Sequence, residues 1–192
     1  MPEIILASTS PYRRELLARL RLPFDTARPE VDETRLPGEA PAALASRLAL
    51  AKAQAIAAQH PAAIVIGADQ VAHMGEEIFS KPGTPERACA QLRQMSGQTV
   101  LFQTAIAVLR QQDGSVLQAT VPTEARFRTL TDAEIARYVE TEQPLDCAGS
   151  AKAEALGISL LDALASDDPT AIIGLPLIRL AHMLRTLGVA LP

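Results

Sequence analysis

The segment from residue 99 to residue 130 constrains the fold most, because it contains two long strand-like runs joined by a short turn. Residues 99–110 read TVLFQTAIAVLR, residues 116–130 read VLQATVPTEARFRTL, and the intervening QQDGS carries an Asp-Gly pair. Apolar and β-branched runs that flank an Asp-Gly turn predict an antiparallel β-hairpin. A chain with such a hairpin does not build its sheet from parallel strands alone.

Strand-like and helix-like segments alternate around this hairpin. Residues 3–8 are apolar, and residues 62–74 form a β-branched run that either ends at GADQ or continues through a bend. Short strands or turns follow at GEE and IFSKPG, and the chain has no repeats or linkers. Interleaved strands and helices with an inserted hairpin predict an α/β fold with a mixed sheet, built as one domain over residues 1–192.

Cap and breaker residues predict where the helices begin and end. Ser10 is a suitable N-cap, Pro11 suits the first helical position, and Leu16, Leu17 and Leu20 then form a buried stripe. The other predicted helices are the alanine-rich run 41–59, the Pro- and Gly-punctuated 84–97, the segment 131–141 with its T-x-x-E capping box, and a last helix within 173–188.

Charge and cysteine content exclude several classes of protein. The chain has 192 residues and a net charge of −4, so no basic stripe is available to neutralise a nucleic-acid backbone. No apolar stretch approaches the roughly 20 residues of a membrane span, and MPEIILAS is a poor signal peptide. Cys89 and Cys147 have no metal-ligand spacing. These features predict a cytoplasmic protein that binds neither nucleic acid nor membrane.

The stretch ASTSP places hydroxyls and backbone N–H groups at the start of a helix, which is an arrangement that binds anions. Arg13 and Arg14 lie in the first turn, where the helix dipole disfavours cations unless an anion is near. The alternative is a plain capped helix with solvated arginines. The spacing of a Walker loop is absent, so a P-loop kinase is not expected.

Three short segments elsewhere carry acidic or basic residues that are candidates for chemistry. Asp69 follows a buried apolar run, where ligands of α/β proteins bind, although it also suits a turn cap. Asp32 and Glu33 are carboxylates suited to a hydrated divalent metal or to a solvated loop. Lys81 in SKPG is either a site residue or an ordinary surface lysine.

Lysine is rare here, since Lys52, Lys81 and Lys152 are the three lysines among 18 basic residues. Codon bias is one explanation for the small number of lysines. An equally good explanation is a need for compact ammonium groups at places where the planar guanidinium of arginine does not fit.

Together these pieces resemble the Maf-type nucleoside triphosphate pyrophosphatases. The resemblance covers nearly the whole chain, because the family's segments occur in order: LASTSPYRRELL, EVDET, LALAKAQA, IGADQV, SKP, CAGSAKAE and IIGLPL. It implies the elongated α/β fold shared with inosine triphosphate pyrophosphatases, which is a mixed sheet flanked by helices, with two lobes and a central cleft. It also implies a homodimer.

The resemblance assigns roles to particular residues. Asp69 is the implied catalytic carboxylate, and Glu33 and Asp69 are the implied ligands of a divalent metal, Mg²⁺ or Mn²⁺. The other residues implied at the phosphate site are Ser8, Thr9, Arg13, Lys52 and Lys81. In the implied reaction, water activated by Asp69 attacks the α-phosphorus of a nucleoside triphosphate and releases pyrophosphate.

Three specificity positions place the chain within the family. The dTTP/UTP-type members carry Arg, Thr and Gln there, whereas this chain has Tyr12, Gln70 and Glu154. That triplet is similar to the subgroup acting on 7-methyl-GTP, whose cationic base suits an aromatic face and a carboxylate. The alternatives are a dTTP/UTP pyrophosphatase and a non-enzymatic nucleotide-binding regulator of cell division.

Overall fold

A computed structural model describes residues 2–192. Its strands are β1 (Ile4–Ala7), β2 (Asp25–Ala27), β3 (Ile64–Met74), β4 (Glu77–Phe79), β5 (Thr99–Arg110), β6 (Ser115–Phe127) and β7 (Leu161–Ser166). Its α-helices are α1 (Pro11–Ala18), α2 (Pro41–Ala57), α3 (Pro85–Met95), α4 (Asp132–Glu142) and α5 (Leu177–Thr186). Short 3₁₀ segments are η1 (Gln111–Asp113), η2 (Ala148–Ser150), η3 (Leu156–Leu160) and η4 (Ala171–Ile173).

The strands form one mixed sheet in the order β2-β1-β3-β5-β6-β7, with β4 paired to the far end of β3. The β1 strand is parallel to both β2 and β3, whereas β3, β5, β6 and β7 pair antiparallel. The β5–β6 hairpin pairs Thr99 with Arg126 and Arg110 with Ser115 across its length. The predicted α/β fold with a mixed sheet and an inserted hairpin is therefore confirmed.

The two alternatives for residues 62–74 are now decided, because β3 is one uninterrupted strand through GADQ. Its first part pairs with β1, from Ile64 to Ile66, and the strand then continues beyond the end of β1 while it stays paired with β5 on its other side. Asp69 therefore lies in mid-strand, opposite Ala105 of β5, and not after the strand as the sequence suggested. The open place beside Asp69 exists because β1 stops at Ala7 while β3 continues.

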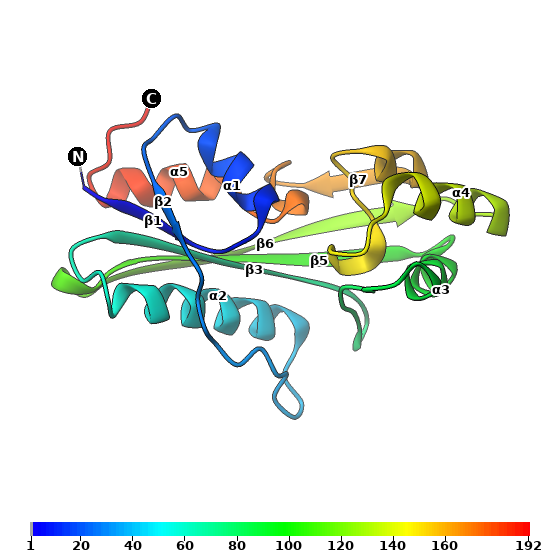
Figure 1. Ribbon diagram of the computed structural model, residues 1–192, viewed down its shortest axis with the longest axis horizontal. Helices are drawn as coiled ribbons and strands as arrows, with labels where there is room; N and C mark the ends of the chain where they lie inside the picture. Colours follow the sequence, from blue (N-terminus) through cyan, green and yellow to red (C-terminus); the bar gives the residue numbers. More distant parts are fainter. Residues whose placement is uncertain (1) are drawn as a thin grey trace.

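Helices cover the elongated sheet differently at its two ends (Figure 1). At one end, α2 packs on one face, while α1 and α5 pack on the other. At the opposite end, α3 and α4 pack against strand side chains such as Phe79, Phe102 and Phe127. Leu16 and Leu17 of α1 are fully buried and Leu20 is half-buried, as the predicted stripe requires.

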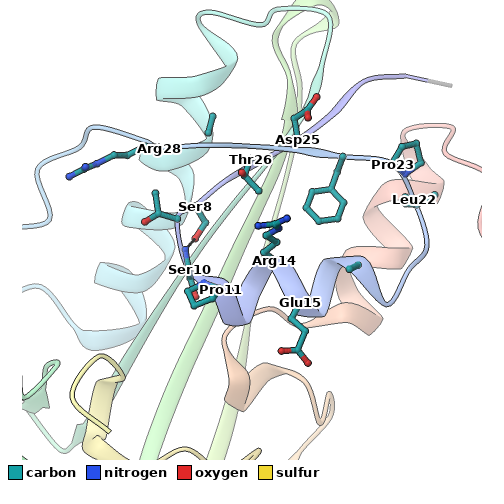
Figure 2. A pocket seen from close by; sticks show the side chains of 14 residues that line it. Ser8, Ser10, Pro11, Arg14, Glu15, Leu22, Pro23, Asp25, Thr26 and Arg28 are labelled. Carbon is teal, nitrogen blue, oxygen red and sulfur yellow. Dashed lines mark hydrogen bonds between the residues drawn. The ribbon is translucent and has the colours of Figure 1, made fainter. Parts of the chain in front are cut away.

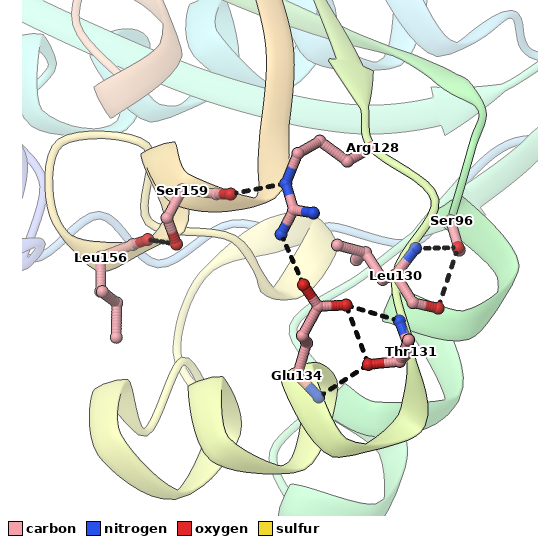
Figure 3. Close-up of polar contacts among 7 residues, drawn as sticks. All are labelled: Ser96, Arg128, Leu130, Thr131, Glu134, Leu156 and Ser159. Atoms are coloured by element: carbon pink, nitrogen blue, oxygen red, sulfur yellow. Dashed lines mark hydrogen bonds and ion pairs between the residues drawn. The ribbon is translucent and has the colours of Figure 1, made fainter.

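A polar network fixes the start of α4 (Figure 3). The predicted capping box is present, because the Thr131 hydroxyl accepts from the Glu134 amide while Glu134 accepts from the Thr131 amide. Arg128 pairs with Glu134 at 3.1 Å, and its Nε donates to the carbonyl of Ser159 at 2.9 Å. These bonds tie the end of β6 to both α4 and η3, and so anchor the segment that follows the 146–155 loop.

Within residues 2–192, no helix has the length and apolar character needed to cross a membrane.

Candidate active site

Two adjoining cavities open where β1 ends. The hydroxyl-lined cavity, of about 500 Å³, is bordered by Ser8, Thr9 and Ser10. The apolar-walled cavity, of about 380 Å³, is bordered by Val71, Ile78, Phe79 and Ile173, among others. Side chains common to both cavities are Ser10, Tyr12, Arg13, Glu33, Lys52, Lys81 and Asp146. Most of the residues assigned from the sequence thus surround one composite cleft.

A buried ion cluster forms the floor of this cleft. The ammonium of Lys52 lies 2.7 Å from Asp69 Oδ1 and 2.7 Å from Glu33 Oε1. The side chains of Lys52 and Asp69 are only 9% and 12% exposed, so their attraction is weakly screened by solvent. Both carboxylates therefore converge on one point that holds a positive charge.

The close packing of α2 on β3 produces this cluster. Gly67 lies two residues before Asp69, so both face α2. A Cβ at Gly67 would collide with the backbone of α2 at Ala49 and Ala53. The missing side chain lets the helix sit directly on the strand, which carries Lys52 to Asp69.

The charge of Glu33 is stabilised by surrounding cations. Desolvation opposes ionisation, but the hydrogen bond from Lys52 and the charges of Lys52, Lys81 and Arg13 together lower the pKa of Glu33. Lys81 is an exposed residue that lines both cavities without a direct contact to either carboxylate among the described ion pairs. The floor of the cleft therefore has cations on several sides of two carboxylates.

The start of α1 forms the wall of the hydroxyl-lined cavity. Ser10 is the N-cap and accepts from the Arg13 amide, and the Ser10 amide donates to Ser8 Oγ at 3.1 Å. The Nε of Arg13 donates to the carbonyl of Gly174 at 2.9 Å, and burial lowers the pKa of Arg13, opposed by Asp69 and Glu33. Arginine keeps its proton in proteins, so Arg13 is charged at physiological pH.

Arg14 points away from this cleft. It lines a third, larger cavity of about 920 Å³ between α1 and β2, and Figure 2 shows its side chain rising from α1 toward Thr26. This cavity borders Ser8 and Ser10 but contains neither Asp69 nor Lys52. Its size does not make it the reaction site, because the carboxylate and ammonium groups lie elsewhere.

Tyr12 stands between the two cavities of the cleft, in contact with two charged side chains. Its hydroxyl donates to Asp146, with both carboxylate oxygens at 3.2 Å. The ammonium of Lys152 lies 5.9 Å from the centre of the Tyr12 ring, within cation–π range. Lys152 also contacts Glu142 at 3.5 Å. One face of the ring is therefore already next to a cation.

The side-chain nitrogen of Gln70 is committed to the protein. Its Nε2 lies within 3.0 Å of Thr104 Oγ1 and of the carbonyls of Ala171 and Ile172. Gln70 thus fastens η4 to β3, and its carbonyl oxygen is the atom left to face the apolar-walled cavity.

Glu154 is the one assigned residue that borders neither cavity of the cleft. It is an exposed residue in the turn between Lys152 and η3. The structure gathers Ser8, Thr9, Arg13 and Tyr12 around the cleft together with the remaining assigned residues, which are Glu33, Lys52, Asp69, Gln70 and Lys81. The role of Glu154 stays a prediction.

Three features of the cleft were missed in the sequence. Asp146 lines both cavities, Gly67 admits α2, and Gly174 supplies the carbonyl that holds Arg13. Gly67 lies in the segment IGADQV and Gly174 in the segment IIGLPL, but nothing in either segment indicates which residue the glycine contacts. Asp146 precedes CAGSAKAE and carries no periodicity or spacing signal of its own.

The donor set of the cleft suits a divalent metal only in part. Among residues 2–192, no group of three or more His, Cys, Asp or Glu side chains is placed to hold an ion. Glu33 and Asp69 nevertheless converge on one cationic atom, as two carboxylates around a metal would. Mg²⁺ typically takes one or two protein carboxylates and completes its shell with water and substrate phosphates. The two carboxylates fit that pattern.

Comparison with known proteins finds relatives that match nearly the whole chain. A relative from Aromatoleum aromaticum, described as a 7-methyl-GTP pyrophosphatase, is 60% identical over 190 residues, covering 99% of this chain and 98% of the relative. A relative with the same description from Xanthomonas axonopodis pv. citri is 57% identical, with both chains fully covered.

A HAM1 protein from Coxiella burnetii is 19% identical, with a TM-score of 0.48, over 66% of this chain and 73% of that protein's chain. The family described as Maf-like protein matches residues 3–187. The chain therefore belongs to the Maf family.

Proposed function

We propose that this chain is a nucleoside triphosphate pyrophosphatase that hydrolyses 7-methyl-GTP to the monophosphate and pyrophosphate. The observation that carries the proposal is the Lys52–Asp69–Glu33 cluster beside a hydroxyl-lined cavity. The names of the two relatives described above supply the substrate.

The cleft divides naturally between the two parts of such a substrate. A triphosphate carries close to four negative charges, and the hydroxyl-lined cavity offers Ser8, Thr9 and Arg13, with Lys81 at its border. The apolar-walled cavity offers Val71, Phe79 and other apolar groups suited to a base.

The chemistry follows from the charges on the floor of the cleft. Asp69 accepts a proton from the attacking water, and its contact with the Lys52 ammonium at 2.7 Å orients the carboxylate. Lys52, Lys81 and Arg13 stabilise the negative charge that grows on the departing pyrophosphate. The γ-phosphate stays attached to the β-phosphate throughout.

Glu33 and Asp69 are the carboxylates that would hold Mg²⁺ or Mn²⁺. Such an ion, when bound, neutralises phosphate charge.

Tyr12, Gln70 and Glu154 are the proposed specificity residues. The favoured substrate carries a positive charge on its base, and an arginine at position 12 would repel that charge. The alternative with specific sequence support is a dTTP/UTP pyrophosphatase of the same family. A non-enzymatic nucleotide-binding regulator is disfavoured, because Lys52, Asp69 and Glu33 are assembled as a charged cluster.

The oligomeric state, the location in the cell and the partners of the protein are proposed as well. We infer that the protein is a homodimer in the cytoplasm with a small-molecule substrate and no nucleic-acid partner. Light scattering on the purified protein and localisation of a tagged chain test the first two statements.

One assay tests the reaction itself. Purified protein with Mg²⁺ or Mn²⁺ is given 7-methyl-GTP, GTP, dTTP and UTP, and pyrophosphate and orthophosphate are measured separately. We expect pyrophosphate as the primary product and the highest kcat/KM for 7-methyl-GTP. Primary release of orthophosphate contradicts the proposed reaction. Faster hydrolysis of dTTP than of 7-methyl-GTP supports the alternative of a dTTP/UTP pyrophosphatase.

A further inference from the structure

Asp146 is a charged side chain of the cleft to which neither the family resemblance nor the motifs assign a role. It is exposed, it lines both cavities, and it lies 134 residues from Tyr12 in the chain while accepting a hydrogen bond from the Tyr12 hydroxyl. Both of its carboxylate oxygens are 3.2 Å from that hydroxyl, which leaves lone pairs on each oxygen for another partner.

The surrounding loop holds Asp146 in this place. After it, Cys147 Sγ donates to the carbonyl of Pro144 at 3.5 Å, and the Ser150 hydroxyl donates to Gln91 Oε1 of α3 at 2.5 Å. Gly149 adopts a left-handed conformation with its Cα against Phe102 and Ala72. The carboxylate is therefore presented to the cleft by a loop anchored on the sheet and on α3.

The charges at this end of the cleft leave Asp146 available. Lys152 lies beside the Tyr12 ring, and its charge acts on Asp146 from beyond ion-pair distance. Its ammonium is bound to the carboxylate and the carbonyl of Glu142. No ion pair of Asp146 within 4.0 Å occurs in the part of the chain that the structure describes. Burial is the main cause that raises the pKa of Tyr12, so its hydroxyl remains a donor that orients the Asp146 carboxylate.

We propose that Asp146 is a specificity-determining residue that selects a cationic purine base, an inference that rests on the proposed function. A base placed between Tyr12 and the apolar wall of the cleft lies beside the Asp146 carboxylate. Guanine is neutral there, whereas 7-methylguanine carries a positive charge that the carboxylate attracts. Asp146 therefore favours the methylated base over its unmethylated parent, while Lys52, Asp69 and the phosphate-binding groups treat the two substrates alike.

The test compares 7-methyl-GTP with GTP, which differ in one methyl group and one charge. For Asp146→Asn we expect the ratio of the two kcat/KM values to fall about three- to tenfold, chiefly through a higher KM for 7-methyl-GTP. The matched control is Glu140→Gln, which removes one negative charge from an exposed position outside both cavities. This control keeps the wild-type ratio.

A second measurement needs no variant to fold. In the wild-type protein, 7-methylguanosine competes with substrate more strongly than guanosine, although neither nucleoside carries phosphate. Added salt weakens the inhibition by the cationic nucleoside more than that by the neutral one. Equal potency of the two nucleosides overturns the proposal.

The outcomes separate the two proposals. If the wild-type protein prefers 7-methyl-GTP and Asp146→Asn keeps the full preference with normal GTP turnover, the role of Asp146 is overturned and the function stands. If the wild-type protein shows no preference for the methylated base, both proposals fail.

Discussion

The two ends of the cleft are built in different ways. At the catalytic end, defined by Lys52, Asp69 and Glu33, the two most buried side chains come from a long helix and a central strand. At the specificity end, defined by Tyr12, Asp146 and Lys152, both charged groups come from the loop between α4 and η3. Glu33 also comes from a loop and Tyr12 from α1, so the difference lies in one pair at each end. A helix and a strand hold Lys52 and Asp69, whereas a loop holds Asp146 and Lys152.

This difference predicts how substitutions at each end should change the activity. A change at the catalytic end should slow every substrate by a similar factor, because the phosphates are the same in each. A change at the specificity end should alter the ratio between substrates and leave the chemical step largely intact. Each of the following experiments tests whether substitutions at the two ends have these different effects.

The largest effect is expected for Asp69→Asn, which is nearly isosteric and removes the proposed general base. We expect kcat to fall by about 10² to 10⁴ for 7-methyl-GTP and for GTP alike. Circular dichroism and thermal unfolding check that the fold is kept. A variant with near-normal kcat would remove Asp69 from the mechanism.

The three lysines divide the two ends more finely. Lys52→Ala and Lys81→Ala should each lower kcat/KM at least about tenfold, equivalent to about 1.4 kcal/mol. Lys152→Ala should cost less, because Lys152 contacts Tyr12 and Glu142 and borders neither cavity. Steady-state kinetics on all three variants provide the comparison, and equal losses would show that the division of roles is wrong.

The double substitution Tyr12→Arg with Glu154→Gln tests the specificity end. It places a cation beside the base and removes a carboxylate, so the preference for 7-methyl-GTP over dTTP should fall about 2- to 30-fold, the range given by a cation–π contact of about 0.5–2 kcal/mol. Competition between the two substrates measures the ratio directly. Full retention of the wild-type preference would show that other residues determine specificity, whereas faster hydrolysis of dTTP by the wild-type protein would favour the dTTP/UTP alternative.

The smallest effect concerns pH and Glu33. Because its pKa is lowered in the folded protein, the stabilisation from ionised Glu33 is present above its ordinary pKa of 4.5 and is lost as the pH falls through the folded-state value. The side chain is 61% exposed, so solvent weakens the effect. The difference in Tm between wild type and Glu33→Gln should be small near pH 7 and should shrink below pH 4.5. A difference that grows in acid would contradict the sign.

Much of the fold was readable from local rules. The hairpin turn, the capping box at Thr131 and the proline-started helices are each set by a few neighbouring residues, so the sequence predicts them directly. The continuation of β3 past Asp69 was left open because it depends on β5, which lies more than thirty residues further along the chain. Pairing of this kind carries no short-range signal.

The site divides in the same way. Family resemblance located Lys52, Asp69 and Glu33, and the structure joins them by direct contacts. The contacts of Asp146 and of the Gly174 carbonyl could not be predicted from the sequence. They depend on the fold, which places Tyr12 beside the loop carboxylate and Arg13 beside the backbone oxygen. The position of Glu154 outside both cavities likewise depends on the path of the 146–155 loop.

The bond between Arg13 and the Gly174 carbonyl has a consequence for synthesis of the protein. Arg13 is among the first residues to leave the ribosome, but its partner follows only after most of the chain, roughly 10–30 s later at usual elongation rates. Leu180 and Leu184 of α5, which pack in the same core as Ile4 and Leu6 of β1, are synthesised equally late. The packing of the first strand and the first helix can therefore be completed only when translation is nearly finished, so apolar side chains of the N-terminal segment stay uncovered during most of synthesis.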